Sequence, residues 1–193
     1  MSTPANKTSF SIVMAVNNQA DELRNEMPTL LTLPYDDYEV VVVDESSTDD
    51  TADVLKQQKA DHKNLYTTFL PKYPFQNNPR RLAFTIGVKA AKKDWIVFTD
   101  VTTLPPSDTW LEELSAYACS PSVLLLGYVN RKSGDIRLET FDDIDRARSI
   151  ISKEEHHRGS NRHGWMRQLL KKTGYDYIAV RADLGHEALR LFA

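Results

Sequence analysis

The sequence contains few of the residues on which several common kinds of site depend. One cysteine among 193 residues excludes an internal disulfide and any zinc or iron–sulfur site built from several cysteines. The seven glycines form no G-x-G pair and no G-x-x-x-x-G-K-[ST] motif, so the glycine cradles of dinucleotide-binding domains and P-loops are absent. Neither G-x-S-x-G nor H-E-x-x-H is found, which excludes the nucleophile elbow of serine hydrolases and the zinc helix of metalloproteases.

Strong charge and long apolar runs are also missing. The formal net charge is −3, so there is no general electrostatic attraction to nucleic acid. No apolar stretch approaches the roughly 18 residues of a membrane-spanning helix. The first nine residues lack the apolar core of a signal peptide. We therefore expect a cytoplasmic protein without a transmembrane segment, and the single cysteine agrees with a reducing compartment.

Three uninterrupted apolar runs indicate strands that are buried on both faces, as in a parallel sheet. They are FSIVMAV at 10–16, VVVV at 40–43 and WIVF at 95–98. Between and beside these runs lie a further expected strand at 64–70 and helical patterns at 20–33, 51–59 and 81–92. This order predicts βαβ units and an α/β fold, a three-layer α/β/α sandwich with a mostly parallel central sheet.

The part of the chain beyond Pro105-Pro106 has a different pattern. Two short strands flank a turn at Ser133-Gly134, and a late strand and a final helix come after a long helical segment. The expected elements are a helix at 107–118, strands at 122–130 and 135–141, a helix at 142–157, a strand at 175–180 and a helix at 183–192. We expect a flexible N-terminus at 1–8 and a single domain at 9–193.

Polar residues follow the three apolar runs at the points where the expected strands end. Asn17 and Asn18 follow the first run, Asp44 and Glu45 the second, and Asp100 the third. Because ligands of open α/β sheets bind beyond the carboxyl ends of the strands, these ends predict one shared ligand site. The two asparagines are equally compatible with a helix cap. A buried carboxylate at the end of four valines needs a partner, such as a nucleobase or a ribose.

Four segments in consistent order resemble the family 2 glycosyltransferases that use nucleotide sugars and have the GT-A fold. They are SIVMAVNN at 11–18, YEVVVVDESSTDDT at 38–51, RLAFTIGVKAA at 81–91 and DWIVFTDVTTLPPSDTWL at 94–111. The resemblance implies a GT-A-like domain with a nucleotide-binding part at 9–130 and an acceptor-side part at 131–193. It implies transfer of a sugar from a nucleotide diphosphate sugar, expected to be UDP-linked, to a glycan or lipid-linked acceptor in polysaccharide biosynthesis.

The resemblance also assigns the matching positions on the nucleoside side of the site. Asp44 would hydrogen-bond uracil or an equivalent base, with Glu45 and Ser46 beside it. The positions that would line the nucleotide pocket just after the first strand are Ala15, Val16 and Asn18.

On the diphosphate side the resemblance implies an arginine and a metal. Arg80 or Arg81 would approach the diphosphate, where a guanidinium makes bidentate contacts, and Thr85 would lie near the ribose or sugar. Asp100 corresponds to the first aspartate of a D-x-D motif, which holds Mg²⁺ or Mn²⁺. The second aspartate is replaced by Thr102, a poorer ligand for these cations. Either the metal binds only with the nucleotide, or basic side chains replace it, or activity is lost.

The catalytic base is the second position at which the sequence departs from the family. An inverting transferase needs a carboxylate that accepts the proton of the acceptor hydroxyl. A distant match to the family's segment makes Asp183 the expected base, with Glu187 as second choice. The alternative is that Asp183 caps the last helix.

Two other functions stay open at this point. The first is a nucleotide-binding protein of the same fold whose catalysis is impaired, and the second is a nucleotidyltransferase. The second is less favoured, because those enzymes usually carry a glycine-rich loop after the first strand. The basic stretch at 158–172, with Trp165, is either a solvated helix face or an acceptor-side loop that meets phosphate or a membrane surface.

Overall fold

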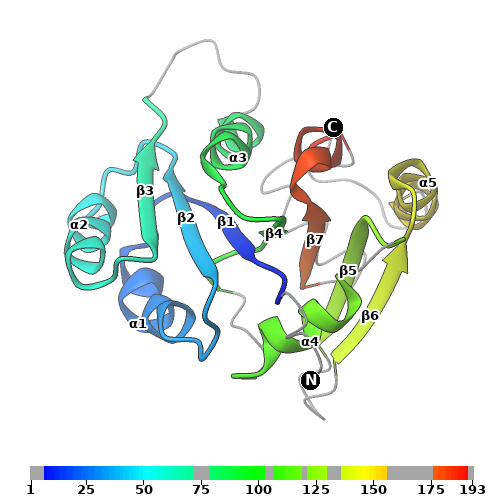
Figure 1. Ribbon diagram of the computed structural model, residues 1–193. Coiled ribbons are helices and arrows are strands. Elements are labelled where there is room, and N and C mark those ends of the chain that lie inside the picture. Colours follow the sequence, from blue (N-terminus) through cyan, green and yellow to red (C-terminus); the bar gives the residue numbers. More distant parts are fainter. Residues whose placement is uncertain are drawn as a thin grey trace, which may run out of the picture.

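The computed structural model describes residues 7–71, 79–102, 107–118, 121–129, 136–155 and 176–190. Within these ranges the centre of the molecule is a seven-stranded sheet (Figure 1). Its strands are β1 (Phe10–Val16), β2 (Tyr38–Asp44), β3 (Leu65–Phe69), β4 (Trp95–Phe98), β5 (Leu124–Val129), β6 (Ile136–Phe141) and β7 (Tyr177–Arg181). Their order across the sheet is β3-β2-β1-β4-β7-β5-β6.

The first four strands form the parallel half of the sheet. β1 pairs with β2 on one side and with β4 on the other, and β2 pairs with the edge strand β3, all in parallel. Every residue of β1 and β4 is buried, as are six of the seven residues of β2. Burial on both faces explains why these segments read as continuous apolar runs without alternation. The predicted parallel core is therefore confirmed.

The other half of the sheet is antiparallel. β5 and β6 form the expected pair of neighbouring strands, and β7 is inserted between β4 and β5, antiparallel to both. The predicted late strand at 175–180 corresponds to β7. Its place in the middle of the sheet depends on pairings between segments that are far apart in the sequence, so the local pattern did not predict it.

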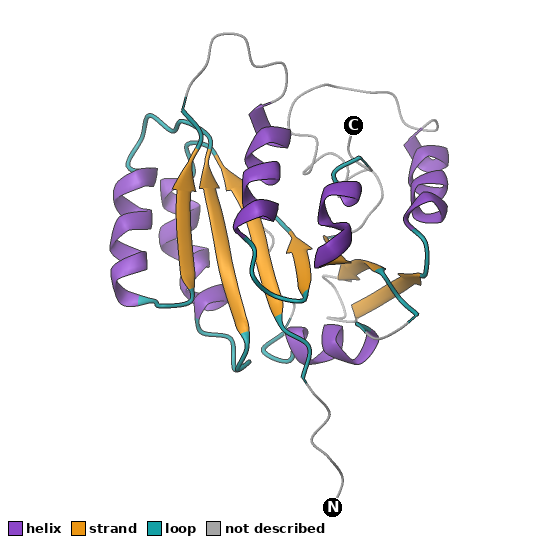
Figure 2. Ribbon diagram, turned by 45° about the horizontal axis from the view of Figure 1, so that its top comes forward, coloured by secondary structure: helices purple, strands orange, loops and turns teal. Residues whose placement is uncertain are grey.

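Helices cover both faces of the sheet, which confirms the predicted α/β/α layers (Figure 2). One buried cluster is shared with α1 (Ala20–Leu31), α2 (Thr51–Asp61) and α4 (Trp110–Tyr117). The opposite cluster is shared with α3 (Pro79–Ala90), α5 (Ile144–Glu155) and α7 (Gly185–Ala188). The expected final helix starts instead as a 3₁₀ turn, η1 (Ala182–Leu184), ahead of the short α7. None of the helices in the described ranges has the length and apolarity to cross a bilayer.

A close approach between α3 and β1 fixes the helix that leads into the candidate site. A Cβ atom on Gly87 would lie 2.3 Å from Cγ1 of Val13, so only glycine allows α3 to pack this closely on the sheet. The contact positions the N-terminal turn of α3, which carries Arg80 and Arg81, near the end of β1.

Candidate functional site

The candidate site lies at the edge of the sheet where β1, β2 and β4 end, here called the carboxyl edge. Asp44 pairs with Val16, and the Glu45 N–H donates to the Val16 carbonyl at 2.8 Å. On the other side of β1, Phe98 pairs with Val13. Phe98 comes two residues before Asp100, so Asp100 lies just beyond this pair. The predicted convergence of the three strand ends at one edge is thus what the structure shows.

Asp44 is held in place by the loop that follows β2. Its side chain Oδ1 accepts hydrogen bonds from the Ser47 backbone N–H at 2.9 Å and from Ser47 Oγ at 2.6 Å. The Asp44 carbonyl accepts the Leu70 N–H at 2.7 Å, and Ser46 Oγ donates to the Leu70 carbonyl. Ser46 adopts a left-handed φ of 58°, and this backbone conformation produces the tight turn of the loop after β2. The carboxylate is therefore buried and ordered by protein donors.

Asn18 joins the loop after β1 to the loop after β2. Its Oδ1 accepts the Thr48 N–H at 2.7 Å and the Asp49 N–H at 3.3 Å, and its own φ is 51°. Asn17 Nδ2 donates to the Glu45 carbonyl at 2.7 Å. Both asparagines thus bridge two strand ends, and neither caps α1, whose N-cap position is Gln19.

A buried ion pair lies behind these loops. Arg80 Nε is 2.7 Å from Glu45 Oε1, and Arg80 Nη1 donates to the Ala15 carbonyl. The Glu45 side chain is 8% exposed and that of Arg80 22%. Glu45 Oε1 has no hydrogen-bond partner in the described part of the chain, so its contact with Arg80 counts as an ion pair alone. Burial raises the pKa of Glu45 to about 7, Arg80 opposes the rise, and the nearby Asp44 and Asp100 add to it.

The two predicted arginines differ in their surroundings. Arg80 is committed to contacts with Glu45 and Ala15, so its guanidinium braces the ends of β1 and β2. Arg81 is exposed at the same turn of α3. Thr85 donates its hydroxyl to the Arg81 carbonyl at 2.8 Å, a bond along the helix. Of the two arginines, Arg81 is the more exposed.

Asp100 and Thr102 form a small hydrogen-bonded turn after β4. Asp100 Oδ1 accepts the Thr102 N–H at 3.0 Å and the Thr102 hydroxyl at 2.7 Å, and Asp100 is 7% exposed. No group of three histidine, cysteine or acidic side chains within the described ranges is arranged to hold a metal ion. A divalent ion that is bound together with a diphosphate needs only one or two carboxylates from the protein, and Asp100 is the carboxylate at this position.

The structure does not bring Asp183 to this edge. Because β7 is antiparallel to β4, Arg181 pairs with Trp95, and the Ala182 N–H donates to the Asp94 carbonyl at 2.8 Å. Asp183 therefore lies beyond the start of β4, at the opposite end of the strand from Asp100. We call this the amino edge.

The environment of Asp183 also differs from that of a general base. Arg181 Nε and Nη2 donate to its two carboxylate oxygens at 2.7 and 2.9 Å. These bonds hold the pKa of Asp183 below its usual range, although the carboxylate is exposed. A base poised near neutral pH needs the opposite shift. Glu187, the second choice, follows in α7 and lies at the same amino edge.

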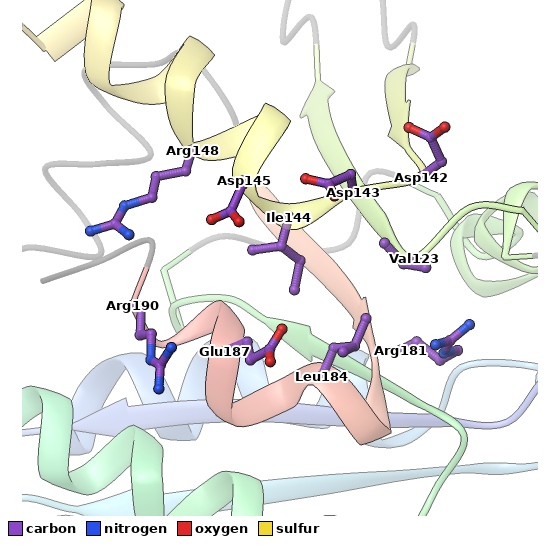
Figure 3. A pocket seen from close by; sticks show the side chains of 10 residues that line it. All are labelled: Val123, Asp142, Asp143, Ile144, Asp145, Arg148, Arg181, Leu184, Glu187 and Arg190. Carbon is purple, nitrogen blue, oxygen red and sulfur yellow. The ribbon is translucent and has the colours of Figure 1, made fainter.

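A pocket of about 360 Å³ is found at the amino edge (Figure 3). It lies between α5 and the segment that follows β7 (Figure 3), and its apolar lining residues are Val123, Ile144 and Leu184. Arg148 and Arg190 point to the same side of it, from α5 and from the end of the α7 segment (Figure 3). The other lining residues are charged: Asp142, Asp143, Asp145, Arg181 and Glu187. None of the predicted nucleotide-binding residues lines this pocket.

Two further residues lie at the carboxyl edge: Asp176, which belongs to the distantly matching segment but was given no role from the sequence, and Phe69, which was not singled out. Asp176 lies two residues before Ile178, which pairs with Phe98, so it reaches the end of β4 near Asp100. Only the antiparallel placement of β7 reveals this. Phe69 ends β3 directly beside Asp44, with which it pairs, and it is 67% exposed. The signal for Phe69 in the sequence was an apolar residue near the end of an expected edge strand.

Comparisons with known proteins give a consistent answer. The family described as "Glycosyl transferase family 2" matches residues 11–178. A curated relative, "Poly(ribitol-phosphate) beta-glucosyltransferase" of Bacillus spizizenii, is 30% identical over 152 residues, which cover 74% of this chain and 23% of the relative. "Poly-beta-1,6-N-acetyl-D-glucosamine synthase" of Staphylococcus aureus is 21% identical over 51% of this chain and 23% of its own length. The chain thus spans about a quarter of the curated relatives that it matches.

Solved structures show the same fold at low sequence identity. A mannosyltransferase of Pyrobaculum calidifontis, solved with GDP-Man and Mn²⁺, superposes with a TM-score of 0.57 at 19% identity, over 68% of this chain and 38% of that one. Glucosyl-3-phosphoglycerate synthase of Mycobacterium tuberculosis, solved with Mn²⁺, UDP and phosphoglyceric acid, gives 0.56 at 15% identity, over 92% and 57%. The fold is GT-A.

Proposed function

Because the chain belongs to glycosyl transferase family 2, we propose that it transfers a sugar from a nucleotide diphosphate sugar to a hydroxyl group of a glycan or lipid-linked acceptor. The observation that carries the proposal is the buried, hydrogen-bonded Asp44 beside the ends of β1 and β4. Hydrogen bonds from Ser47 already hold the Asp44 carboxylate in place, so the site needs little rearrangement when a nucleotide binds.

We propose a UDP-linked donor. Asp44 accepts the ring N–H of the base, with Ser46 beside it, while Ala15, Val16 and Asn18 line the pocket after β1. Two pieces of support come from similar proteins: TarS of S. aureus was solved with UDP-GlcNAc, and the mycobacterial synthase with UDP. The mannosyltransferase was solved with GDP-Man, so GDP is the second donor nucleotide to test.

On the diphosphate side we assign Arg81 and Asp100. Arg81 contacts the phosphates, Arg80 with Glu45 braces the loop ends, and Thr85 lies on the same helix toward the sugar. Asp100 would hold Mg²⁺ or Mn²⁺ together with the diphosphate. Such an ion, when bound, offsets the charge that develops on the leaving diphosphate.

The reaction makes and breaks one bond each at the anomeric carbon. The acceptor oxygen forms a bond to this carbon, the bond from the carbon to the diphosphate oxygen breaks, and the hydroxyl proton passes to a base. We assign the base to Asp176, since it comes from the acceptor-side part and reaches the end of β4. Asp176→Asn is expected to lower kcat at least 100-fold with the donor KM nearly unchanged. Wild-type kcat in this variant would remove Asp176 from the mechanism.

We propose a polymeric acceptor. The names of the curated relatives favour a polymer of sugars or of polyol phosphates, and residues 131–193 are assigned to it. The basic stretch at 158–172 lies outside the described residues. A cytoplasmic location stays a prediction.

The second candidate function is a nucleotide-binding protein of the same fold whose catalysis is impaired. It is favoured by Thr102, because a hydroxyl group takes the place of the second carboxylate of the D-x-D motif.

Nucleotide binding tests the proposal directly. UDP, with and without Mn²⁺, is expected to raise the Tm of the wild-type chain by several degrees, because a ligand that binds only the folded state stabilises it. Asp44→Ala should lose most of this rise. Asp183→Ala, which removes a carboxylate at the amino edge, is the matched control and should keep it. A wild-type Tm that neither UDP nor GDP raises would refute the proposal.

A further inference from the structure

Phe69 is the most exposed large hydrophobic side chain in the described part of the chain, at 67%. The others with high exposure are Tyr117 at 48%, Tyr66 at 40% and Leu82 at 38%. A single exposed apolar side chain is common in soluble proteins and needs no explanation by itself. Phe69 lies beside the buried Asp44, and this position makes it a candidate for a contact with the ligand.

Phe69 lies in the same row of the sheet as Asp44 and Val16. The register of the parallel strands pairs Val16 with Asp44 and Asp44 with Phe69. Paired residues in adjacent parallel strands project to the same face, so the three side chains are neighbours on one face. The outermost of them is the phenyl ring, since β3 is the edge strand.

The end of β3 is also tied to the loop that positions Asp44. The Leu70 N–H donates to the Asp44 carbonyl at 2.7 Å, and Ser46 Oγ donates to the Leu70 carbonyl. Both bonds are made by Leu70, the residue directly after Phe69, and they fix the backbone next to Phe69 relative to Asp44. The exposed ring is therefore presented from an ordered backbone.

We propose that Phe69 stacks on the nucleobase of the donor and so contributes to nucleotide affinity. The inference rests on the proposed function and adds a specific contact to it. A planar base whose ring N–H bonds to Asp44 lies over the end of β2, within reach of the adjacent phenyl ring. Stacking suits any base, because every base has a π face, so Phe69 supplies affinity while Asp44 supplies selection.

Tyr66, on the same edge strand, provides a matched control. It pairs with Val41, three residues before Asp44, and therefore projects to the other face of the sheet. Lys59 Nζ lies 5.4 Å from the centroid of its ring, so this aromatic already has a partner. Tyr66 is partly exposed, as is Phe69, so replacing either residue by alanine removes no side chain from the buried core.

The experiment measures nucleotide affinity of the full 193-residue chain by calorimetry, with UDP and then GDP as probes. Phe69→Ala is expected to weaken binding at least tenfold, and Phe69→Tyr to stay within about threefold of wild type. Tyr66→Ala should bind like wild type. As a second readout, Phe69→Trp should show fluorescence that the nucleotide quenches beyond the wild-type change, whereas Tyr66→Trp should not.

The outcomes separate this inference from the proposed function. Tight wild-type binding that Phe69→Ala leaves unchanged, or an unquenched Trp at position 69, overturns the stacking contact and leaves the nucleotide site standing. Equal weakening by Phe69→Ala and Tyr66→Ala also overturns it, since the effect would then be a general one of the edge strand. A wild-type chain that binds neither nucleotide overturns both proposals together.

Discussion

The two edges of the sheet both carry an arginine–carboxylate pair, yet the pairs differ in almost every physical respect. At the carboxyl edge, the side chains of Glu45 and Arg80 are 8% and 22% exposed, and burial raises the pKa of the acid. At the amino edge, Arg181 and Asp183 are 46% and 60% exposed, and the pKa of the acid is lowered. The exposed pair has the better geometry, with two parallel hydrogen bonds.

This difference shows that good hydrogen-bond geometry and burial are separate properties of an ion pair. Solvent screens the amino-edge charges, and such pairs contribute little to stability. At the carboxyl edge three acidic side chains, Asp44, Glu45 and Asp100, lie in a poorly solvated region with Arg80 among them. Clusters of titratable side chains whose pKa values are shifted by burial and by neighbouring charges are frequent at functional sites. On this ground we propose that the functional site lies at the carboxyl edge, although the pocket described above is at the amino edge.

The largest expected effect is on stability, from removal of each arginine. At pH 8, where Glu45 is mostly ionised in the wild type, Arg80→Met leaves the buried carboxylate without a cation and should lower the free energy of unfolding by about 3 kcal/mol, as for other buried pairs that lose one partner. Arg181→Met should lower it by less than about 1 kcal/mol, because water solvates Asp183. Chemical denaturation of the two variants measures both. Equal losses of unfolding free energy in the two variants would show that burial does not distinguish the two ion pairs.

The next effect concerns pH. The pKa of Glu45 in the folded state, about 7, lies above its ordinary value of 4.5, so the folded state binds this proton more tightly than the unfolded state does. Its contribution to stability is therefore complete below about pH 4.5 and is lost as the pH rises through 7. Between pH 5 and 8 the wild type should lose about 2 kcal/mol relative to Glu45→Gln.

Denaturation of the wild type and Glu45→Gln at several pH values measures this difference. Asp183→Asn serves as the control over the same range. Its carboxylate has a lowered pKa, so its contribution is present above pH 4 and disappears only in acid. Parallel stability curves for the wild type and Glu45→Gln would contradict the raised pKa.

A smaller effect is expected from completing the D-x-D motif. Thr102→Asp supplies a second carboxylate beside Asp100 and should tighten Mn²⁺ binding in the presence of UDP by about tenfold, because carboxylate count tunes hard-cation sites. Calorimetry of Mn²⁺ into the UDP complex measures it, with Thr109→Asp, on the exposed turn before α4, as a control for added charge. A gain of transfer activity in Thr102→Asp alone would favour the impaired-enzyme alternative.

The sequence predicted the parallel half of the fold well because the information there is local. Strands buried on both faces have to be apolar throughout, so the runs around Val13, Val42 and Val97 coincide with β1, β2 and β4. The polar residues at the ends of these runs also had to meet, since parallel strands end at one edge. For this reason Asp44 and Asp100 were found together without any knowledge of tertiary contacts.

The rest of the candidate site depended on long-range pairing, which the local pattern does not encode. The expectation for Asp183 came from a distant sequence match, and the antiparallel direction of β7 carries it to the amino edge. The same direction carries Asp176 to the carboxyl edge. The choice between Arg80 and Arg81 likewise required side-chain packing, because both are arginines on one helical turn and only the structure shows which of them is buried against Glu45.

The most direct test of the central claim is a crystal structure of the full chain with UDP and Mn²⁺. The account predicts density for the base against Asp44 and for the diphosphate and metal next to Asp100, at the ends of β1, β2 and β4. Density for the nucleotide in the amino-edge pocket, between Arg148 and Arg190, would contradict it.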